Sequence, residues 1–424
     1  MDQLAEYIDD LAAFITASPS SYHAAAEAAR RLDDDGFTPL AEDQEWPAQP
    51  GGYYVLRDGA LIAWLQPAAA GPTTPFRVLG AHTDSPGFKL KPRPSTGSRG
   101  WLQAGVEVYG GPLLNSWLDR ELELAGRIVL RDGTQRLVRT GPMLRIPQLA
   151  IHLDREVNNG LALDKQRHVQ PVWGAGEDGD LLGVIGQFAG VDAAEIGGYD
   201  LLTADTQAPA RFGHDAALFA AGRMDNLVSV HAGVRALIAA AHQGGAGGQI
   251  SVLAAFDHEE LGSQTRSGAS GPILDDVLTR VEENLGATRS QQRQAYAGSW
   301  CLSADCGHAV HPNYPERHDP ANQPVAGGGV LLKINANQRY ATDATGAALM
   351  ARLAARSGAP VQEFVSNNTV PCGSTIGPLT ATRLGIRTVD VGVPLLSMHS
   401  ARELVHTADA VALGDLAGAF FAGA

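Results

Sequence analysis

The chain has 424 residues, 44% of them hydrophobic and 6% aromatic, so it can bury a large aliphatic core and has the length of about two to three domains. Acidic residues outnumber basic ones by 46 to 32, and the net charge of -14 argues against a protein that binds nucleic acids or anionic membranes. None of the four lysines follows a glycine, which excludes the P-loop and the ATP hydrolysis that depends on it.

The cysteines and the N-terminus indicate a cytoplasmic protein. Cys301, Cys306 and Cys372 are too few and odd in number for a disulfide framework, and their spacing is not that of a zinc ribbon. The first apolar stretch contains Asp9 and Asp10, which a secretion signal would not contain. No apolar run approaches the roughly 18 residues that would span a bilayer, so we expect neither secretion nor membrane insertion.

Helices and strands are mixed in the first 88 residues. Leu4, Ile8, Leu11 and Ile15 recur at helical spacing and predict an amphipathic helix at the start of the chain. The elements expected after it are a helix over residues 24–32 and strands over residues 53–56, 61–65 and 76–79. We expect residues 1–88 to form the first part of an α/β domain.

Residues 89–219 have a different pattern. Polar and apolar residues alternate over 121–124, and an Asp132-Gly133 turn separates the following apolar stretch from residues 135–139. This arrangement is typical of β-hairpins, and convincing helical periods are few in this part of the chain. We therefore predict a β-rich domain inserted at residues 89–219.

From residue 220 onward, strands and helices alternate. The expected helices cover residues 226–242, 272–285, 345–356, 376–384 and 408–421, and the expected strands cover residues 250–256, 300–304, 329–335, 361–365 and 388–393. Such alternation is typical of a mostly parallel sheet with helices on both faces, as in doubly wound α/β folds. We therefore expect residues 1–88 and 220–424 to form one α/β domain.

Acidic and histidine residues follow four of the expected strands. They are His82 and Asp84 after the first, Glu259 and Glu260 after the second, Asp305 after the third and His399 after the fourth, while Asp225 precedes a helix. The carboxyl ends of strands in an open α/β sheet form one ligand-binding edge, so these side chains can converge there. Two imidazoles and several carboxylates suit zinc or manganese, and their number suits two ions.

Taken singly, most of these residues also have a structural explanation. The alternatives are a hydrogen-bonded histidine near the core for His82, a helix N-cap for Asp225, a turn cap for Asp305 and a surface position for His399. Glu259 and Glu260 are harder to explain in this way, because adjacent carboxylates after a buried strand repel each other unless a cation or a proton lies between them. The set as a whole therefore favours a metal site.

Two other classes of hydrolase lack their motifs here. Gly262 stands where a His-Glu-x-x-His zinc helix would have its second histidine, and no serine has the flanking glycines of a nucleophile elbow. Cys306, next to Asp305, is better explained as a small buried thiol than as a nucleophile.

Along nearly its whole length, the sequence resembles the aspartyl aminopeptidase family, a branch of the two-metal aminopeptidases. The segments that carry the resemblance are residues 18–23, 81–86, 149–153, 223–227, 256–263, 303–305, 308–314, 333–342 and 398–403. Some of these segments are weak by themselves, but their order and separation are highly specific.

The resemblance implies a catalytic α/β domain of the dinuclear zinc-peptidase type, interrupted by a β-rich domain that mediates dimer contacts within a dodecamer. It implies two divalent metal ions per subunit, with zinc expected and manganese or cobalt as alternatives. By matching motifs, His82 and Asp305 would hold one ion, Glu260 and His399 the other, and Asp225 would bridge them.

The resemblance also implies roles for residues that do not hold metal. Glu259 would be the general base, and Asp84 would orient His82. His152, in the inserted domain, would reach into the active site of a neighbouring subunit, and Lys333 with Tyr340 would bind the substrate near its acidic side chain.

We therefore interpret the chain as a cytoplasmic, homo-oligomeric metallo-aminopeptidase that removes N-terminal residues, preferentially Asp or Glu, from peptides. One alternative is a related two-metal exopeptidase or deacylase that prefers neutral residues. Another, of a different class, is a self-assembling peptide-binding protein without activity. The complete set of five ligands together with Glu259 argues against the second alternative, because an inactive descendant would be expected to have lost at least one of them.

Overall fold

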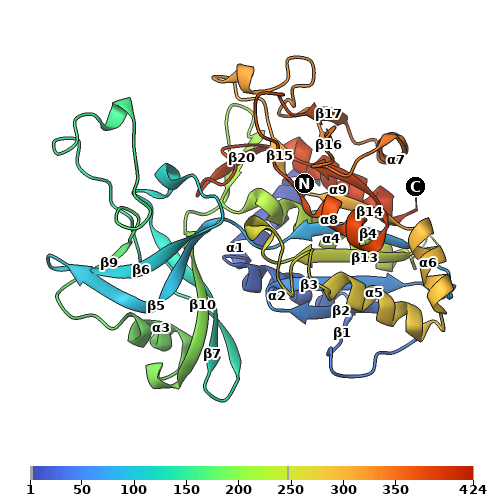
Figure 1. Cartoon of the computed structure of the whole chain (residues 1–424), viewed down its shortest axis with the longest axis horizontal. Helices are drawn as coiled ribbons and strands as arrows, with labels where there is room; N and C mark the ends of the chain where they lie inside the picture. The colour runs from blue at the N-terminus through green and yellow to red at the C-terminus, as the bar shows by residue number, and fades with distance from the viewer. Residues whose placement is uncertain (1–2, 246–247, 424) are drawn as a thin grey trace.

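The chain folds around three β-sheets, as seen in a computed structural model that describes residues 3–245 and 248–423. Figure 1 shows the nine-stranded and the six-stranded sheet in two lobes that lie side by side. A five-stranded sheet contains strands from distant parts of the chain.

The nine-stranded sheet is mixed and mostly parallel. In spatial order its strands are β1 (Thr38–Pro39), β2 (Gly51–Arg57), β3 (Ala60–Gln66), β13 (Ile250–Phe256), β4 (Phe76–His82), β14 (Trp300–Ala304), β18 (Arg387–Gly392), β16 (Val330–Ile334) and β17 (Val361–Val365). The four central strands, β13, β4, β14 and β18, are parallel to one another. Strands β2 and β3 form an antiparallel hairpin, and β16 runs antiparallel to β18. The prediction of a mostly parallel α/β sheet is confirmed.

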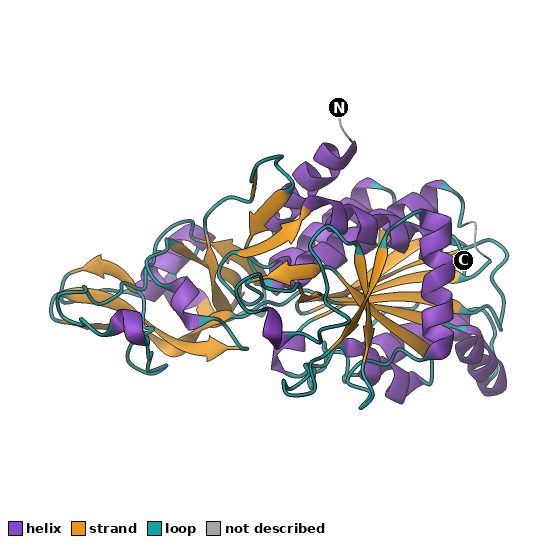
Figure 2. Ribbon diagram, turned by 90° about the horizontal axis from the view of Figure 1, so that it is seen from above, coloured by secondary structure: helices purple, strands orange, loops and turns teal. Residues whose placement is uncertain are grey.

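Helices cover both faces of this sheet, which Figure 2 shows as a fan of strands between helical layers. One face is covered by α1 (Gln3–Ala17), α2 (Ser21–Asp34), α4 (Met224–His242), α7 (Ala344–Ser357) and α9 (Thr407–Phe421), and the other by α5 (Ile273–Asn284), α6 (Arg289–Gly298) and α8 (Ile376–Leu384). Neighbouring residues of β13 divide between the two cores, since Leu253 packs in one and Val252 in the other. Burial on both faces explains why these strands are continuous apolar runs in the sequence.

The six-stranded sheet is antiparallel throughout and confirms the predicted hairpin. Its spatial order is β8 (Gln135–Arg139), β7 (Leu122–Leu130), β10 (Ile196–Asp205), β5 (Gly87–Ser98), β6 (Trp101–Tyr109) and β9 (Val172–Ala175). The sequence prediction missed α3 (Leu181–Ala189), which buries Leu181 and Ile185 in this lobe.

The five-stranded sheet pairs two strands that follow this lobe in the chain with three strands from the C-terminal part. It contains β11 (Ala210–Phe212), β12 (Leu218–Ala221), β20 (Glu403–His406), β19 (Pro394–Leu396) and β15 (Gly307–His308). Strand β11 belongs to this sheet although it precedes residue 220. The division of the chain at residues 89–219, and the role of that segment in dimer contacts, stay predictions.

Within residues 3–245 and 248–423, none of the helices combines the length and the apolar character that crossing a lipid bilayer requires.

Candidate metal centre

Strand pairing brings the predicted site residues to one edge of the nine-stranded sheet. His82, the last residue of β4, is paired with Phe256, the last residue of β13, and the short helix η4 (Glu259–Leu261) begins three residues after β13 ends. Strand β14 runs parallel to β4 on its other side and ends one residue before Asp305. The carboxyl ends of these parallel strands therefore deliver their polar side chains to a common place.

Asp225 reaches this edge from the start of α4, where its backbone angles are not helical. The next residue, Asn226, donates a hydrogen bond from its side chain to the backbone oxygen of Ala304, at 2.8 Å. This bond ties the start of α4 to the end of β14, beside Asp305. In the structure Asp225 is therefore not the N-cap that its position before a helix allowed.

The two carboxylate oxygens of Asp225 face two different groups of side chains. Oδ1 lies 3.4 Å from Nε2 of His82, which is itself 3.6 Å from Oδ1 of Asp305. Oδ2 lies 3.4 Å from Nε2 of His399, which is 3.3 Å from Oε1 of Glu260. The five predicted ligands thus form two sets that share Asp225.

Buried oxygens without partners indicate that cations fit between these side chains. Among the described residues, Oδ1 of Asp225 and Oε1 of Glu260 are buried and have no hydrogen-bond partner. One potential ligand atom from each of His82, Asp225 and Glu260 lies within 4.8 Å of the others. Unpaired buried carboxylates are unfavourable, and imidazole nitrogens with carboxylate oxygens are ligands that zinc and similar ions accept. The residues present therefore fit a metal centre.

The pKa values of the carboxyl groups also indicate that the buried carboxylates outnumber the positive charges available to balance them. Burial and the nearby charge of Asp225 raise the pKa of Glu260 well above its ordinary value, and burial raises the pKa of Glu259 to about 8. Burial opposes the ionisation of Asp225 as well, but His399 and His82 hold its pKa well below the usual range. Bound cations would favour the ionised form of every one of these groups.

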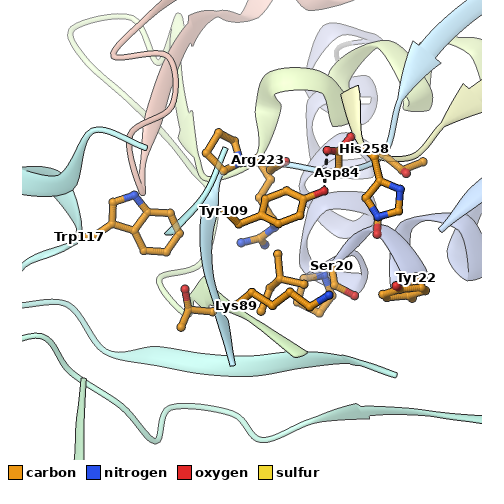
Figure 3. A pocket seen from close by; sticks show the side chains of 15 residues that line it. Ser20, Tyr22, Asp84, Lys89, Tyr109, Trp117, Arg223 and His258 are labelled. Atoms are coloured by element: carbon orange, nitrogen blue, oxygen red, sulfur yellow. Dashed lines mark hydrogen bonds between the residues drawn. The ribbon is translucent and has the colours of Figure 1, made fainter. Parts of the chain in front are cut away.

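Asp84 connects His82 with the segment that carries Glu259 and Glu260. Nδ1 of His82 lies 3.0 Å from the backbone oxygen of Asp84 and 3.4 Å from its Oδ1. The carboxylate of Asp84 accepts hydrogen bonds from the backbone N–H groups of Glu259, at 2.9 Å, and Glu260, at 3.2 Å. A third hydrogen bond, at 2.9 Å, comes from the hydroxyl of Tyr109 (Figure 3).

Sequence reasoning did not assign a role to Glu403, which is fully buried in β20. Its Oε2 accepts a hydrogen bond from the backbone N–H of Asp225, at 3.0 Å, and its Oε1 accepts one from the backbone N–H of His399, at 2.8 Å. One carboxylate thereby holds the backbones of two predicted ligands. A glutamate in a short apolar strand was the available signal, since a buried carboxylate needs hydrogen-bond donors.

Left-handed backbone conformations of non-glycine residues recur next to these side chains. The φ angles are +59° at Arg223, +62° at His258 and +65° at His399. Such conformations are unfavourable by about 1–3 kcal/mol each and are concentrated at functional sites. Their position beside three of the acidic and histidine segments supports a functional role for this edge.

Lys333 and Tyr340 lie close together near Asp305. Lys333, in β16, is only 1% exposed, and its Nζ donates a hydrogen bond to the backbone oxygen of Cys306, at 2.6 Å. The same nitrogen lies 5.2 Å from the centre of the Tyr340 ring. Cys306 itself is buried, and burial raises the pKa of its thiol well above the ordinary value.

His152 does not join these residues within its own chain. It is exposed, in the connection between β8 and β9. Figure 1 shows this connection extending from the smaller lobe away from the nine-stranded sheet.

The sequence has close relatives among bacterial aminopeptidases. One from Streptomyces avermitilis, named a probable M18 family aminopeptidase 2, is 56% identical over 422 residues that cover 98% of each chain. A protein of the same name from Mycobacterium tuberculosis is 44% identical over 419 residues, which cover 97% of this chain and 96% of the relative.

Solved structures of related proteins have the same fold. The structure of an S. cerevisiae mApe1 dodecamer matches with a TM-score of 0.85 and 29% identity, over 99% of this chain and 96% of that one. The protein solved in the cryo-EM structure of the Ape4 and Nbr1 complex matches with a TM-score of 0.95 and 34% identity, over 99% of this chain and 86% of that one.

The family model described as aminopeptidase I zinc metalloprotease (M18) matches residues 14–421. This match and the identity to the bacterial relatives show that the protein is an enzyme, a metallo-aminopeptidase. They confirm the activity that the sequence resemblance implied. The chain belongs to the M18 family of zinc metallo-aminopeptidases.

Proposed function

We propose that this aminopeptidase uses two divalent ions, zinc in the first instance, to remove N-terminal Asp and Glu residues from peptides. The observation that carries the proposal is the division of the ligands by Asp225, with His82 and Asp305 on one side and Glu260 and His399 on the other. The three cysteines are free in the described chain, which supports a cytoplasmic location.

The side chains of the proposed metal centre have different roles in peptide hydrolysis. When bound, the two ions would supply Lewis acidity that activates water and polarises the scissile carbonyl. Glu259 is partly buried near His82 and Asp305, and its carboxylate belongs to neither ligand set. It accepts the proton of the attacking water and delivers it to the leaving amine. Asp84 keeps His82 and Glu259 in their relative positions through the hydrogen bonds described above.

The proposed preference for acidic residues depends on Lys333. The net charge of -14 repels acidic peptides, so their selection requires a local cation whose attraction exceeds the screened field of the surface. Lys333 is such a cation. Its buried ammonium group donates a hydrogen bond to the backbone oxygen of Cys306, the residue that follows the proposed ligand Asp305 in the chain. The ring of Tyr340 lies against this ammonium group and restricts the position of the Lys333 side chain.

Lys333→Met should reduce kcat/KM for substrates with N-terminal Asp or Glu roughly 10- to 150-fold, the effect of losing one charge-assisted hydrogen bond. The loss should be smaller for Leu and Ala, because these side chains make no such bond. The measurement is hydrolysis of aminoacyl reporters with Asp, Glu, Leu, Ala and Arg, with and without a chelator, which should abolish every activity.

The control for this substitution is Lys91→Met, which makes the same change in β5 of the six-stranded sheet. An unsubstituted enzyme that prefers Leu or Ala would contradict the acidic preference and support the neutral exopeptidase. An equal loss on all five reporters would show that Lys333 serves structure or transition-state polarisation instead.

Assembly is proposed as a second requirement for activity, with His152 acting in a neighbouring subunit as an oxyanion donor. The surroundings of His152 support an interface, because Leu149, Ile151 and Leu153 are 61%, 46% and 75% exposed. Adjacent exposed apolar side chains are typical of surfaces that a partner covers. The dodecamer of the S. cerevisiae relative makes a similar assembly of this chain the proposed state.

His152→Ala should lower kcat about 10²- to 10³-fold without removing metal, the usual effect of losing an oxyanion donor. Its action in trans is tested by co-expression with the inactive variant Glu259→Gln. In a mixed dimer, the subunit with His152→Ala keeps Glu259 and receives an intact His152 from the other subunit, so this one site should be active. If pairing is random and two-fold symmetric, about half of the dimers are mixed, and about a quarter of all sites regain activity.

The control is a chain that carries both substitutions, expressed alone, which should stay inactive. If His152 acts within its own subunit, co-expression restores nothing. A monomer isolated by dilution that kept full kcat would likewise contradict the role in trans.

A further inference from the structure

The short segment of residues 109–111, which begins at the last residue of β6, lies against the proposed metal centre. It belongs to the lobe of the six-stranded sheet and not to the sheet that carries the ligands. Nevertheless it contacts Asp84, which orients His82 of one ligand set, and it also contacts Glu260 and His399 of the other set. None of the motifs that predicted the site included it.

Tyr109 contacts the side of the centre that contains His82. Its side chain is 7% exposed, and its hydroxyl donates a hydrogen bond to Oδ2 of Asp84, itself 2% exposed. Figure 3 shows this hydroxyl directed at Asp84 from the neighbouring lobe. Because Asp84 also accepts the backbone N–H groups of Glu259 and Glu260, the bond from Tyr109 completes the set of donors that fixes its orientation.

The two glycines that follow contact the other side of the centre. The backbone oxygen of Gly111 lies 3.0 Å from Nδ1 of His399, and this bond leaves Nε2 free to face Asp225 and Glu260. Gly110 has a φ of +68°, and a Cβ added to it would lie 3.2 Å from Cβ of Glu260. The segment is therefore packed closely against one ligand and hydrogen bonded to a second.

We infer that residues 109–111 position both halves of the metal centre from within the same subunit, with Tyr109 acting through Asp84. This inference rests on the proposed function, because it takes His82, Glu260 and His399 as ligands. Hydrogen-bonding partners of ligands fix ring orientation and tautomer, and their loss typically weakens metal affinity about 10- to 100-fold. The smaller lobe thus contributes to the site in each subunit, whatever it contributes to assembly.

The test is Tyr109→Phe, which removes one hydroxyl and keeps the ring. We expect the dissociation constant for zinc, measured by competition with a chelator, to rise 10- to 100-fold. At saturating zinc, kcat should fall while KM stays within about twofold, because the hydroxyl contacts Asp84. The matched control is Tyr54→Phe, since the buried Tyr54 donates an equivalent bond to Asp33, at 2.8 Å, away from the centre.

A second pair of variants tests the glycine contact in the same way. Gly110→Ala should also weaken zinc binding, because its methyl group crowds Glu260. Gly100→Ala is the control, because Gly100 has a similar φ of +79° in the β5–β6 turn but has nothing within 4 Å of an added Cβ. It should carry the same backbone strain without the loss of zinc.

The outcomes separate this inference from the function on which it rests. An unchanged zinc dissociation constant in Tyr109→Phe and Gly110→Ala, or an equal change in the two controls, would overturn the positioning role alone. An unsubstituted protein that binds no zinc at these residues would overturn the proposed function and the inference together.

Discussion

Asp225→Ala should produce a protein that holds neither of the two proposed metal ions and has lost at least about 10³-fold in kcat, since metal-ion catalysis supplies several kcal/mol. The reason is geometric, because each oxygen of Asp225 faces a different ligand set, at 3.4 Å from His82 and 3.4 Å from His399. Elemental analysis of the purified protein measures the metal directly. Circular dichroism shows whether the fold is retained.

His399→Ala is the comparison that makes this result specific. It removes a ligand from one set only, so one ion should remain with His82, Asp305 and Asp225. One ion per subunit in the active, unsubstituted enzyme would contradict the two-ion proposal. Retention of both ions by Asp225→Ala would contradict the bridging role of Asp225.

Glu259→Gln should lower kcat by at least about 10²-fold, the usual contribution of a general base, while both metal ions stay bound. Glutamine keeps the shape of the side chain and the backbone N–H that donates to Asp84, but it cannot accept a proton. Burial raises the pKa of Glu259 to about 8, and the charge of bound ions would bring it down toward the range of a base that works near neutrality.

Glu260→Gln is the matched control for Glu259→Gln, because the same change is made one residue further along, at a proposed ligand. It should lose metal, in contrast to Glu259→Gln. If Glu259→Gln lost metal to the same extent, Glu259 would be a ligand and not the base. If it kept kcat within tenfold, the proton would have to be accepted by another group.

The larger fold was predictable because burial imposes a pattern on the sequence. Strands covered on both faces are continuous apolar runs, and the fully buried strands β13 (Ile250–Phe256) and β14 (Trp300–Ala304) have the predicted bounds. The helix α6 was missed because its sequence is mostly polar and buries only Gln292, Ala295 and Tyr296. The helix α3 is too short for a clear apolar periodicity. The signal that could have predicted it is Asp180, whose side chain caps its N-terminus.

The candidate site was predictable only where the sequence places charge after an apolar strand. His82 and Asp305 satisfy that condition, and strand pairing then fixes their proximity. Glu403 and Tyr109 act on the site through hydrogen bonds to residues far away in the chain, the bond from Asp225 to Glu403 spanning 178 positions. The local sequence can indicate that a carboxylate such as that of Glu403 is buried, but it does not show which donors the carboxylate meets, because that geometry exists only after the sheets have packed.

The place of β13 between β3 and β4 has a consequence for the order in which the chain can fold during synthesis. All strands of the six-stranded sheet lie between residues 87 and 205, and they can pair as soon as this stretch has left the ribosome. Strands β3 and β4 are made earlier, but their common neighbour ends at Phe256, and two further central strands, β14 and β18, follow later still. Translation therefore completes the smaller sheet while the edges of the ligand-bearing sheet are still unpaired.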